Sequence, residues 1–422
     1  MSRMQLLARA AATLAMGVAI AGCSDTKELV RPTPPLDPIF ARYVALGNSI
    51  TAGMQSGGIN DSTQMQSYAV LLAAKMGTPF SIPLLSLPGC PPPIDDIVTG
   101  HRVGGGTGTT CLLRADVDGQ AVINNVAVPN ATVSDPTDPL GQGANNALSM
   151  LILGGRTQAQ RASDARPTFA SVWIGNNDVL TAAVAGILTP LPGVSPGLTD
   201  VETFTTKYGD MLHQLAPAGS AESGRFAPGA PQGGVLIGVV NVTNIPLFIP
   251  AVAILNPQVK AAAEQFIGKT LTVDASCTPT TQSLLDFRLL TEIKAGTQPD
   301  TIACAPIANH PRLLGDIFVL DPAEIVTITE RVAAYNAAIQ QAAEGLGWAY
   351  VDPNPALLEL RGTGGIPLVP DLTNPAAPFG AYFSLDGVHP SAAGQQLLAD
   401  LIALGINEKY GTALAVPSGV AP

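Results

Sequence analysis

Residues 43–53, YVALGNSITAG, place a serine directly after a short apolar run. The run 43–47 has the composition of a strand that is buried on both faces, and the residues after Ser49 permit a helix. Ser49 therefore stands where a strand ends and a helix begins, among backbone N–H groups that lack helical partners. Such N–H groups can stabilise an oxyanion, although a serine at this place can also act simply as a helix cap.

Apolar runs of the same kind recur along the chain and alternate with helical patterns. Further strands are predicted at 80–87, 168–174, 235–242 and 348–352. Helices are predicted at 64–76, 145–153, 201–215, 322–346 and 391–410. This alternation predicts an α/β fold in which a parallel sheet lies between two layers of helices. Ligands of such sheets bind beyond the carboxyl ends of the strands.

Three stretches are longer than ordinary connections, near 91–143, 181–234 and 246–319. The second is helical only in part. The third contains two helix-like pieces, at 258–268 and 282–294. It forms either a cap over the site or a peripheral addition, and the sequence leaves both readings open.

The N-terminal residues are predicted to form an export signal. Residues 1–22 combine two arginines with a short apolar stretch that ends in Ala19-Ile-Ala-Gly-Cys23, which resembles a bacterial lipobox. Cys23 would then carry diacylglycerol, and the proline-rich segment 23–39 would be a tether. An ordinary signal peptide is the alternative. Because serine rather than aspartate follows Cys23, we expect a lipid-anchored protein of the cell envelope, at the outer membrane.

The overall charge limits the partners. The 422 residues carry a net charge of −11, which argues against binding nucleic acid or the surface of anionic lipid. The chain is 46% hydrophobic and 13% charged, which is ample for a buried core despite 43 glycines and 37 prolines. We therefore expect a globular protein with long ordered loops.

Four cysteines besides Cys23 suggest two disulfides in an exported protein. Three pairings are open from the sequence. We favour Cys90–Cys111 and Cys277–Cys304, because each pair brackets one loop-rich segment. A metal site is disfavoured, since no Cys-x-x-Cys spacing is present.

Two further polar clusters follow or precede predicted elements. Trp173-Ile-Gly-Asn-Asn-Asp178 closes an apolar run, and its side-chain amides could donate to an oxyanion or only form a turn. Ser384-Leu-Asp-Gly-Val-His389 precedes the last helix. Asp386 and His389 are close enough for the carboxylate to orient the imidazole, which leaves the other ring nitrogen as a base.

Together the three clusters resemble those of the SGNH/GDSL hydrolase family. Gly47-Asn-Ser-Ile50 matches the first block, Gly175-Asn-Asn-Asp178 matches the Gly-x-Asn-Asp block, and Asp386 to His389 matches the Asp-x-x-His block. The oxyanion glycine of the remaining block matches Gly89. The resemblance implies a three-layer, flavodoxin-like domain over 40–415. Asn48 departs from the family's aspartate, which affects local hydrogen bonding rather than the chemistry.

The resemblance implies the roles of the site residues. Ser49 is the nucleophile, His389 its base and Asp386 the orienting carboxylate. The oxyanion is held by the N–H groups of Ser49 and Gly89 and by the amide of Asn177 rather than Asn176. No metal or organic cofactor is required.

The expected substrate is a small ester, from acetyl to butyryl, because long loops such as 91–143 offer few large apolar side chains. The strongly apolar run 245–255 is interpreted as core, with one wall of an acyl pocket as the alternative. A carbohydrate O-acetylesterase and a phospholipase are the rival enzymes, and the blocks do not separate them. A lipid-anchored binding protein without activity is the rival of another class. It is disfavoured because the serine, asparagine and histidine of the blocks are all present.

Overall fold

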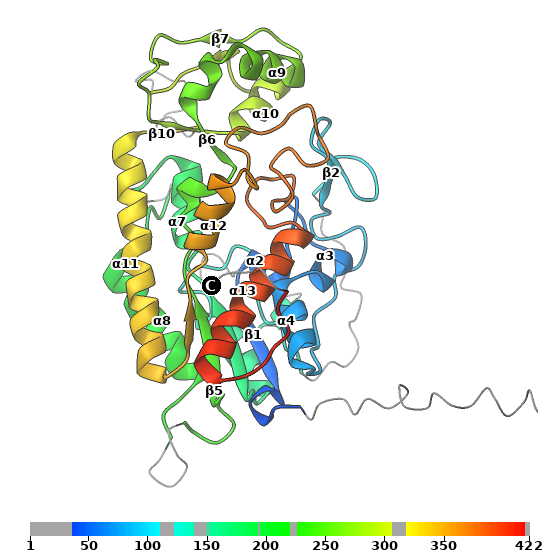
Figure 1. Ribbon diagram of the computed structural model, residues 1–422, viewed down its shortest axis with the longest axis vertical. Coiled ribbons are helices and arrows are strands. Elements are labelled where there is room, and N and C mark those ends of the chain that lie inside the picture. The colour runs from blue at the N-terminus through cyan, green and yellow to red at the C-terminus, as the bar shows by residue number, and fades with distance from the viewer. Residues whose placement is uncertain are drawn as a thin grey trace, which may run out of the picture. The chain divides into compact units, whose positions relative to one another are not determined.

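Four short apolar segments form the central sheet. The computed structural model describes residues 36–109, 122–138, 149, 152–192, 195–219, 226–305 and 318–417. The strands are β1 Tyr43–Gly47, β4 Phe169–Trp173, β5 Gly233–Ile237 and β11 Ala349–Val351. They are hydrogen-bonded in the order β1-β4-β5-β11, and every neighbouring pair is parallel. Figure 1 labels β1 and β5 of this sheet. The predicted parallel sheet is confirmed.

Successive side chains of β1 enter two different cores. Tyr43 and Ala45 belong to one cluster of buried residues, and Val44 and Leu46 belong to the other. Side-chain direction alternates with every residue of a strand, so a strand that is buried on both faces needs apolar residues throughout. This explains why the run shows no alternation of polar and apolar residues.

Helices cover both faces of the sheet. On the face of Tyr43 lie α4 Tyr68–Met76 and α13 Ala392–Tyr410. On the face of Val44 lie α6 Gln158–Asp164, α7 Asn177–Ala185, α8 Val201–Leu215 and α11 Pro322–Leu346. The longest, α11, begins with a capping box between Asp321 and Glu324 and ends at the left-handed Gly347. The bounds of α8 and α11 agree with the predicted helices.

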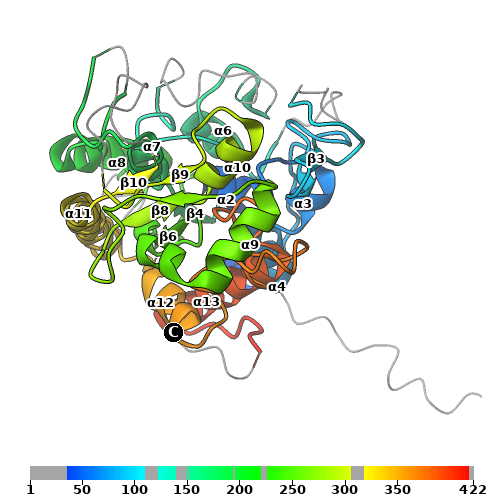
Figure 2. The same ribbon diagram turned by 90° about the horizontal axis from the view of Figure 1, so that it is seen from above.

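The segment 246–320, which we call the cap, has secondary structure of its own. Its elements are β6 Phe248–Pro250, η3 Ala251–Leu255, α9 Pro257–Ile267, β7 Thr272–Val273, β8 Leu284–Asp286, α10 Arg288–Ala295, β9 Thr301–Ile302 and β10 Val319–Leu320. An antiparallel sheet runs in the order β10-β8-β6, and β7 pairs with β9. A disulfide joins Cys277 to Cys304. The cap occupies the top of Figure 1, and Figure 2 looks down on it.

Shorter elements connect these parts. They are η1 Pro38–Phe40, α2 Ser49–Ala52, α3 Asp61–Met65, β2 Ile94–Asp96, β3 His101–Arg102, η2 Val242–Asn244 and α12 Asn354–Gly362. The helix predicted at 64–76 begins later than expected, at Tyr68. Ser67 caps α4 by accepting from the Val70 N–H, and this cap separates α4 from α3. The helix predicted at 282–294 is likewise divided into β8 and α10.

The strand predicted at 80–87 is not formed. This stretch contains Pro83, which has no N–H to donate to a sheet. The chain beside β1 is instead the segment 124–128. The Ala45 N–H donates to the Asn124 carbonyl (2.8 Å), and the Val126 and Val128 N–H groups donate to Ala45 and Gly47 (2.9 and 3.1 Å). This segment runs parallel to β1 on the side away from β4.

Several sequence-based predictions fall outside the described residues. They are the signal 1–22, lipidation at Cys23, the pairing of Cys90 with Cys111, and most of the helix at 145–153. In the described part of the chain, none of the helices has both the length and the apolar character needed to cross a membrane.

Candidate active site

Ser49 occupies a tight turn between β1 and α2. A Cβ atom at Gly47 would lie 2.7 Å from the Trp173 carbonyl oxygen, so only glycine fits there. The Asn48 side chain then caps α2 by accepting from the Ile50 N–H (3.2 Å). The helix ends after one turn at Gly53, whose φ is 91°. Ser49 is held by this turn at the carboxyl end of β1 and is 7% exposed.

The structure brings Ser49, His389 and Asp386 into one chain of hydrogen bonds. The Ser49 Oγ lies 2.8 Å from the His389 Nε2, and the His389 Nδ1 lies 2.7 Å from the Asp386 Oδ2. Asp386 and His389 lie on the turn before α13, more than 300 residues after Ser49. With Nδ1 protonated and facing the carboxylate, Nε2 is free to accept the serine proton.

Four further donors fix the Asp386 carboxylate. Its oxygens accept from the backbone N–H groups of Gly57 (2.6 Å), Val388 (2.9 Å) and His389 (2.8 Å), and from the Ser384 hydroxyl (3.1 Å). Burial alone would raise the pKa of this carboxyl, but the charge of His389 and the hydrogen bonds from the His389 ring and from the His389 and Val388 N–H groups outweigh it and lower the pKa to about 2. Asp386 is therefore ionised at neutral pH and cannot rotate freely.

Asn176 and Asn177 follow β4 but make different contacts. The Asn177 Nδ2 donates to the Ala131 carbonyl (2.9 Å), and this residue begins α7. The Asn176 Oδ1 accepts from the Val240 N–H (2.9 Å). Both side chains reach the space beside Ser49. The Asn177 amide has a second hydrogen, which leaves it able to donate to a bound oxygen.

Gly89 lies elsewhere. It does not line either of the two cavities at His389 that are described below. A Cβ at Gly89 would meet the Ile59 carbonyl at 2.6 Å, so this glycine serves close packing between loops. Asn130 comes two residues after the segment beside β1, is left-handed (φ 66°) and lines a cavity together with Asn177 and His389. The sequence pattern did not single out Asn130, because the expected glycine followed the strand predicted at 80–87, which is not formed.

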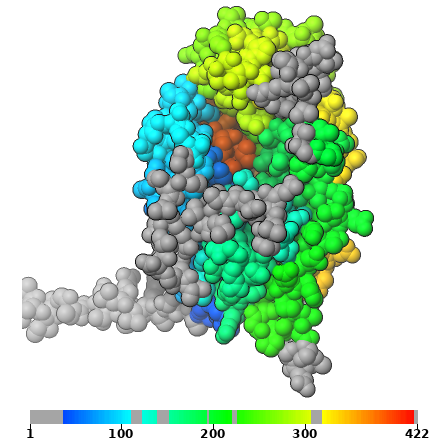
Figure 3. Space-filling view, turned by 180° about the vertical axis from the view of Figure 1, so that it is seen from behind, coloured from blue at the N-terminus to red at the C-terminus, as the bar shows by residue number. Residues whose placement is uncertain are grey.

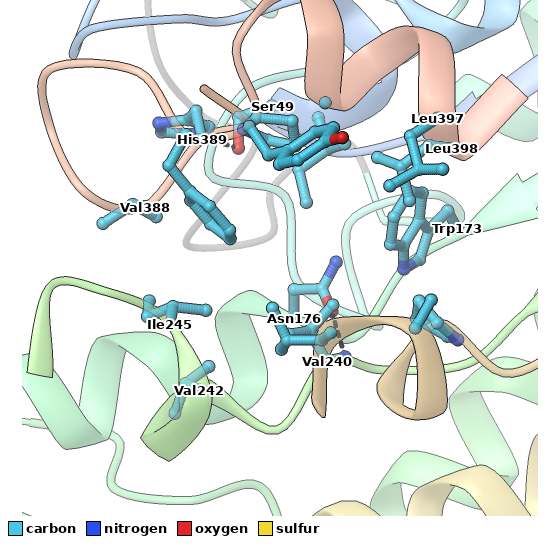
Figure 4. Close-up of a pocket in the computed structure, with 18 of the residues that line it drawn as sticks. Ser49, Trp173, Asn176, Val240, Val242, Ile245, Val388, His389, Leu397 and Leu398 are labelled. Carbon is cyan, nitrogen blue, oxygen red and sulfur yellow. Dashed lines mark hydrogen bonds between the residues drawn. The ribbon is translucent and has the colours of Figure 1, made fainter. Parts of the chain in front are cut away.

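Two cavities meet at the triad, and the first is a mainly apolar pocket (Figure 4). Ser49 and His389 lie at one end of it, Trp173 lies on the opposite side beside Leu398, and Asn48 and Asn176 also line it. Its apolar wall includes Ile50, Val240, Val242, Ile245, Leu357 and Leu398. These residues come from α2, η2, α12, α13 and the loops beside η2, all on the carboxyl side of the sheet. We call this cavity the apolar pocket.

The second cavity is a wide cleft between the cap and the rest of the protein. His389 and Asn130 line its inner end, and Phe287, Arg288 and Lys294 line it from the cap. Figure 3 shows the cleft as a hollow beneath the yellow-green cap, with the orange-red part of the chain at its floor. The described residues of the cap therefore form one wall of this cleft and are not a peripheral addition.

His101 lies apart from Ser49, His389 and Asp386. His101 pairs with Asp95 (2.5 Å) on an exposed hairpin, with no serine in its hydrogen-bond network. Among the described residues, no group of three or more histidine, cysteine, aspartate or glutamate side chains is placed to hold a metal ion.

The chain is similar to known hydrolases. Residues 43–402 match the family model of the GDSL-like lipase/acylhydrolases. A search of curated protein sequences gave no match.

Solved structures with a related fold include three hydrolases. One is an α/β hydrolase enzyme from the metagenome of Lake Arreo, Spain (13% identity, 87% of this chain and 95% of that chain, TM-score 0.36). Another is an acetylxylan esterase from Geobacillus stearothermophilus (15% identity, 89% of this chain and 96% of that chain, TM-score 0.35). The third is an extracellular lipase from Streptomyces rimosus (15% identity, 87% of this chain and 97% of that chain, TM-score 0.33). At these identities and TM-scores we take the family from the match over residues 43–402 alone.

Proposed function

The chain belongs to the GDSL-like lipase/acylhydrolase family and is a carboxylic ester hydrolase, and we propose that it works through Ser49, His389 and Asp386. The hydrogen-bonded chain from the Ser49 Oγ to the Asp386 Oδ2 carries this proposal. The Ser49 Oγ attacks the ester carbonyl carbon while the His389 Nε2 takes its proton. The same nitrogen then protonates the departing alcohol. Water repeats the sequence on the acyl-enzyme and releases the acid.

Three N–H groups are suited to hold the oxyanion. The Ser49 N–H belongs to the first turn of α2, where backbone donors have no partner within the helix. The Asn177 Nδ2 has one hydrogen beyond the one given to Ala131. For the third donor we propose the Asn130 N–H in place of Gly89, because Asn130 faces the cleft beside Asn177. Removing one such donor lowers kcat about 10²–10³-fold.

The two cavities suggest how an ester lies on Ser49. His389 lines both, so an ester carbonyl at Ser49 can extend one substituent into each. The leaving alcohol must be reached by the His389 Nε2 and then exchange with water, which suits the wide cleft. The apolar pocket suits the acyl group, since burying each methylene is worth about 0.8 kcal/mol.

The apolar pocket changes the expected acyl length. The sequence favoured acetyl to butyryl esters, because the long loops have few large apolar side chains. The pocket wall comes instead from η2, α12 and α13. We therefore propose acyl chains of about six carbons or more. Four methylenes beyond butyryl would raise kcat/KM by up to about 200-fold.

Pocket-filling substitutions test the acyl assignment. Val242→Phe places a larger side chain in the wall of the pocket and should lower kcat/KM for 4-nitrophenyl octanoate far more than for the acetate. Leu358→Phe is the matched control, because Leu358 lies on α12 but is 53% exposed and does not line the pocket. Equal losses on both esters in Val242→Phe would show that the acyl chain lies elsewhere.

Ser49→Ala tests the nucleophile. It should lower ester turnover by several orders of magnitude and leave the thermal midpoint nearly unchanged, because the change removes chemistry rather than packing. Ser163→Ala is the control, since the Ser163 hydroxyl donates only to a carbonyl within α6. A Ser49→Ala variant with more than about a tenth of the wild-type rate would exclude Ser49 as nucleophile.

The cellular location is also part of the proposal. The lipobox-like sequence before Cys23 supports a lipid anchor, and the serine at position 24 supports the outer membrane. The anchor would keep the hydrolase at the cell envelope.

A further inference from the structure

Three residues that line the apolar pocket each carry a buried side-chain N–H group for which the described residues provide no hydrogen-bond acceptor. They are the Asn48 Nδ2, the Trp173 Nε1 and the Asn176 Nδ2. Their residues are 1%, 1% and 6% exposed. A buried donor without an acceptor costs about 1–3 kcal/mol. Such donors at the wall of a binding pocket indicate that a bound molecule supplies the acceptor.

The orientations of the two amides are fixed by the backbone. The Asn48 Oδ1 accepts from the Ile50 N–H and the Asn176 Oδ1 accepts from the Val240 N–H. Turning either amide over would place its NH₂ group against a backbone N–H. Each Nδ2 is therefore held away from the bonded side, and Figure 4 shows the nitrogen of Asn176 turned into the pocket, opposite its bond to Val240.

The three donors come from one edge of the sheet. Gly47 of β1 is the register partner of Trp173 at the end of β4. Asn48 directly follows Gly47, and Asn176 lies three residues after Trp173. Because the carboxyl ends of neighbouring parallel strands meet at the same edge, the three residues lie at one edge of the sheet, and all three line the apolar pocket.

We propose that these three donors bind an oxygen atom carried along the acyl chain of the substrate. This inference rests on the assignment of the apolar pocket to the acyl group. A carbonyl, ether or internal ester oxygen fits, because it only accepts hydrogen bonds. A carboxylate does not fit, since no lysine or arginine lines the pocket to pair with it. The substrate class is therefore an oxo-, alkoxy- or acyloxy-acyl ester rather than a plain fatty ester.

Matched esters test this directly. The 4-nitrophenyl esters of 4-oxopentanoic, 5-oxohexanoic and 6-oxoheptanoic acid are compared with those of 4-methylpentanoic, 5-methylhexanoic and 6-methylheptanoic acid. Each oxo ester has a carbonyl oxygen where its partner has a methyl group, so the two differ little in size. For at least one chain length we expect the ratio of kcat/KM, oxo over methyl, to fall about tenfold when a donor is removed, as one hydrogen bond would predict.

Trp173→Phe removes one donor and keeps an aromatic ring, and Asn176→Leu is a second variant should the first not fold. Trp348→Phe is the matched control. The Trp348 Nε1 is also buried without an acceptor among the described residues, but Trp348 does not line the pocket. The control should leave the ratio unchanged.

An unchanged ratio at every chain length, in both variants, would overturn the inference. It can arise because kcat/KM changes on neither ester, or because it falls equally on oxo and methyl esters, which would make the donors part of the oxyanion site. Either leaves the proposed function standing, because the wild type still hydrolyses both esters. Failure of the wild type to hydrolyse either ester would instead contradict the proposed function.

Discussion

Replacing Asp386 by asparagine tests the hydrogen-bond chain at its best-defined point. The Asp386 Oδ2 accepts from the His389 Nδ1 and the Gly57 N–H, and the Oδ1 accepts from two backbone N–H groups and the Ser384 hydroxyl. An amide must place its NH₂ against one of these sets of donors. The Oδ2 side is the less crowded, so the NH₂ will face the His389 Nδ1. The imidazole must then carry its proton on Nε2, where it can no longer accept from Ser49.

The expected loss has two parts. The wrong tautomer lowers kcat about 10⁴-fold in a serine hydrolase triad, which corresponds to about 5 kcal/mol in the barrier. Stability also falls, because the pKa of the Asp386 carboxyl is lowered to about 2 in the folded protein. A lowered pKa stabilises the fold above the unfolded value near 4 by about 2 kcal/mol, and this stabilisation is lost as the pH falls towards 2.

Kinetics with a 4-nitrophenyl ester and urea unfolding at pH 7 measure the two parts separately. Asp95→Asn is the matched control, because Asp95 also pairs with a histidine but on the exposed hairpin. It should leave kcat unchanged. If Asp386→Asn retains more than about a tenth of the wild-type kcat, the carboxylate does not set the tautomer and the reasoning fails.

Three further predictions concern other residues. Asn177→Ala should lower kcat about 10²–10³-fold with a smaller change in KM, and Asn176→Ala should lower it far less on plain esters; the reverse ranking would place the oxyanion donor one residue earlier. Burial raises the pKa of Asp178 to about 7, so the wild type should lose stability relative to Asp178→Asn as the pH rises from about 4 to 7. Urea unfolding at pH 5 and at pH 8 measures the difference in free energy of unfolding between the two proteins. The same difference at both pH values would contradict this prediction. Cys23→Ser should move the protein from the membrane fraction to the soluble fraction without altering its activity on soluble esters, whereas continued membrane association would require another anchor.

The site was largely predictable because its residues lie at the ends of elements with strong sequence patterns. Ser49 follows a fully apolar strand, and Asp386 and His389 are three residues apart, so local spacing brings the carboxylate to the imidazole. The distance of 2.8 Å between the Ser49 Oγ and the His389 Nε2 depends on packing between residues more than 300 positions apart, which no local pattern contains.

Three features could not be predicted in the same way. The chain beside β1 is the segment 124–128 rather than 80–87, because Pro83 removes a donor from the more apolar of the two candidates. Asn130 is left-handed, and asparagine tolerates this conformation without a sequence signal as clear as that of glycine. Only one part of the apolar pocket, at Ile245, lies in the run 245–255 that was considered as an acyl wall, because the rest of its wall comes from α12, α13 and η2, which are far apart in the sequence.

The most direct test of the central claim is to identify the residue that a fluorophosphonate ester modifies. Such reagents react with the activated serine of an ester hydrolase and leave a phosphonyl group on its oxygen. We expect one phosphonyl group per chain, found by mass spectrometry on the tryptic peptide from Tyr43 to Lys75 and located on Ser49, and no modification in His389→Ala. Inhibition of ester hydrolysis with the phosphonyl group on any other residue would contradict the account.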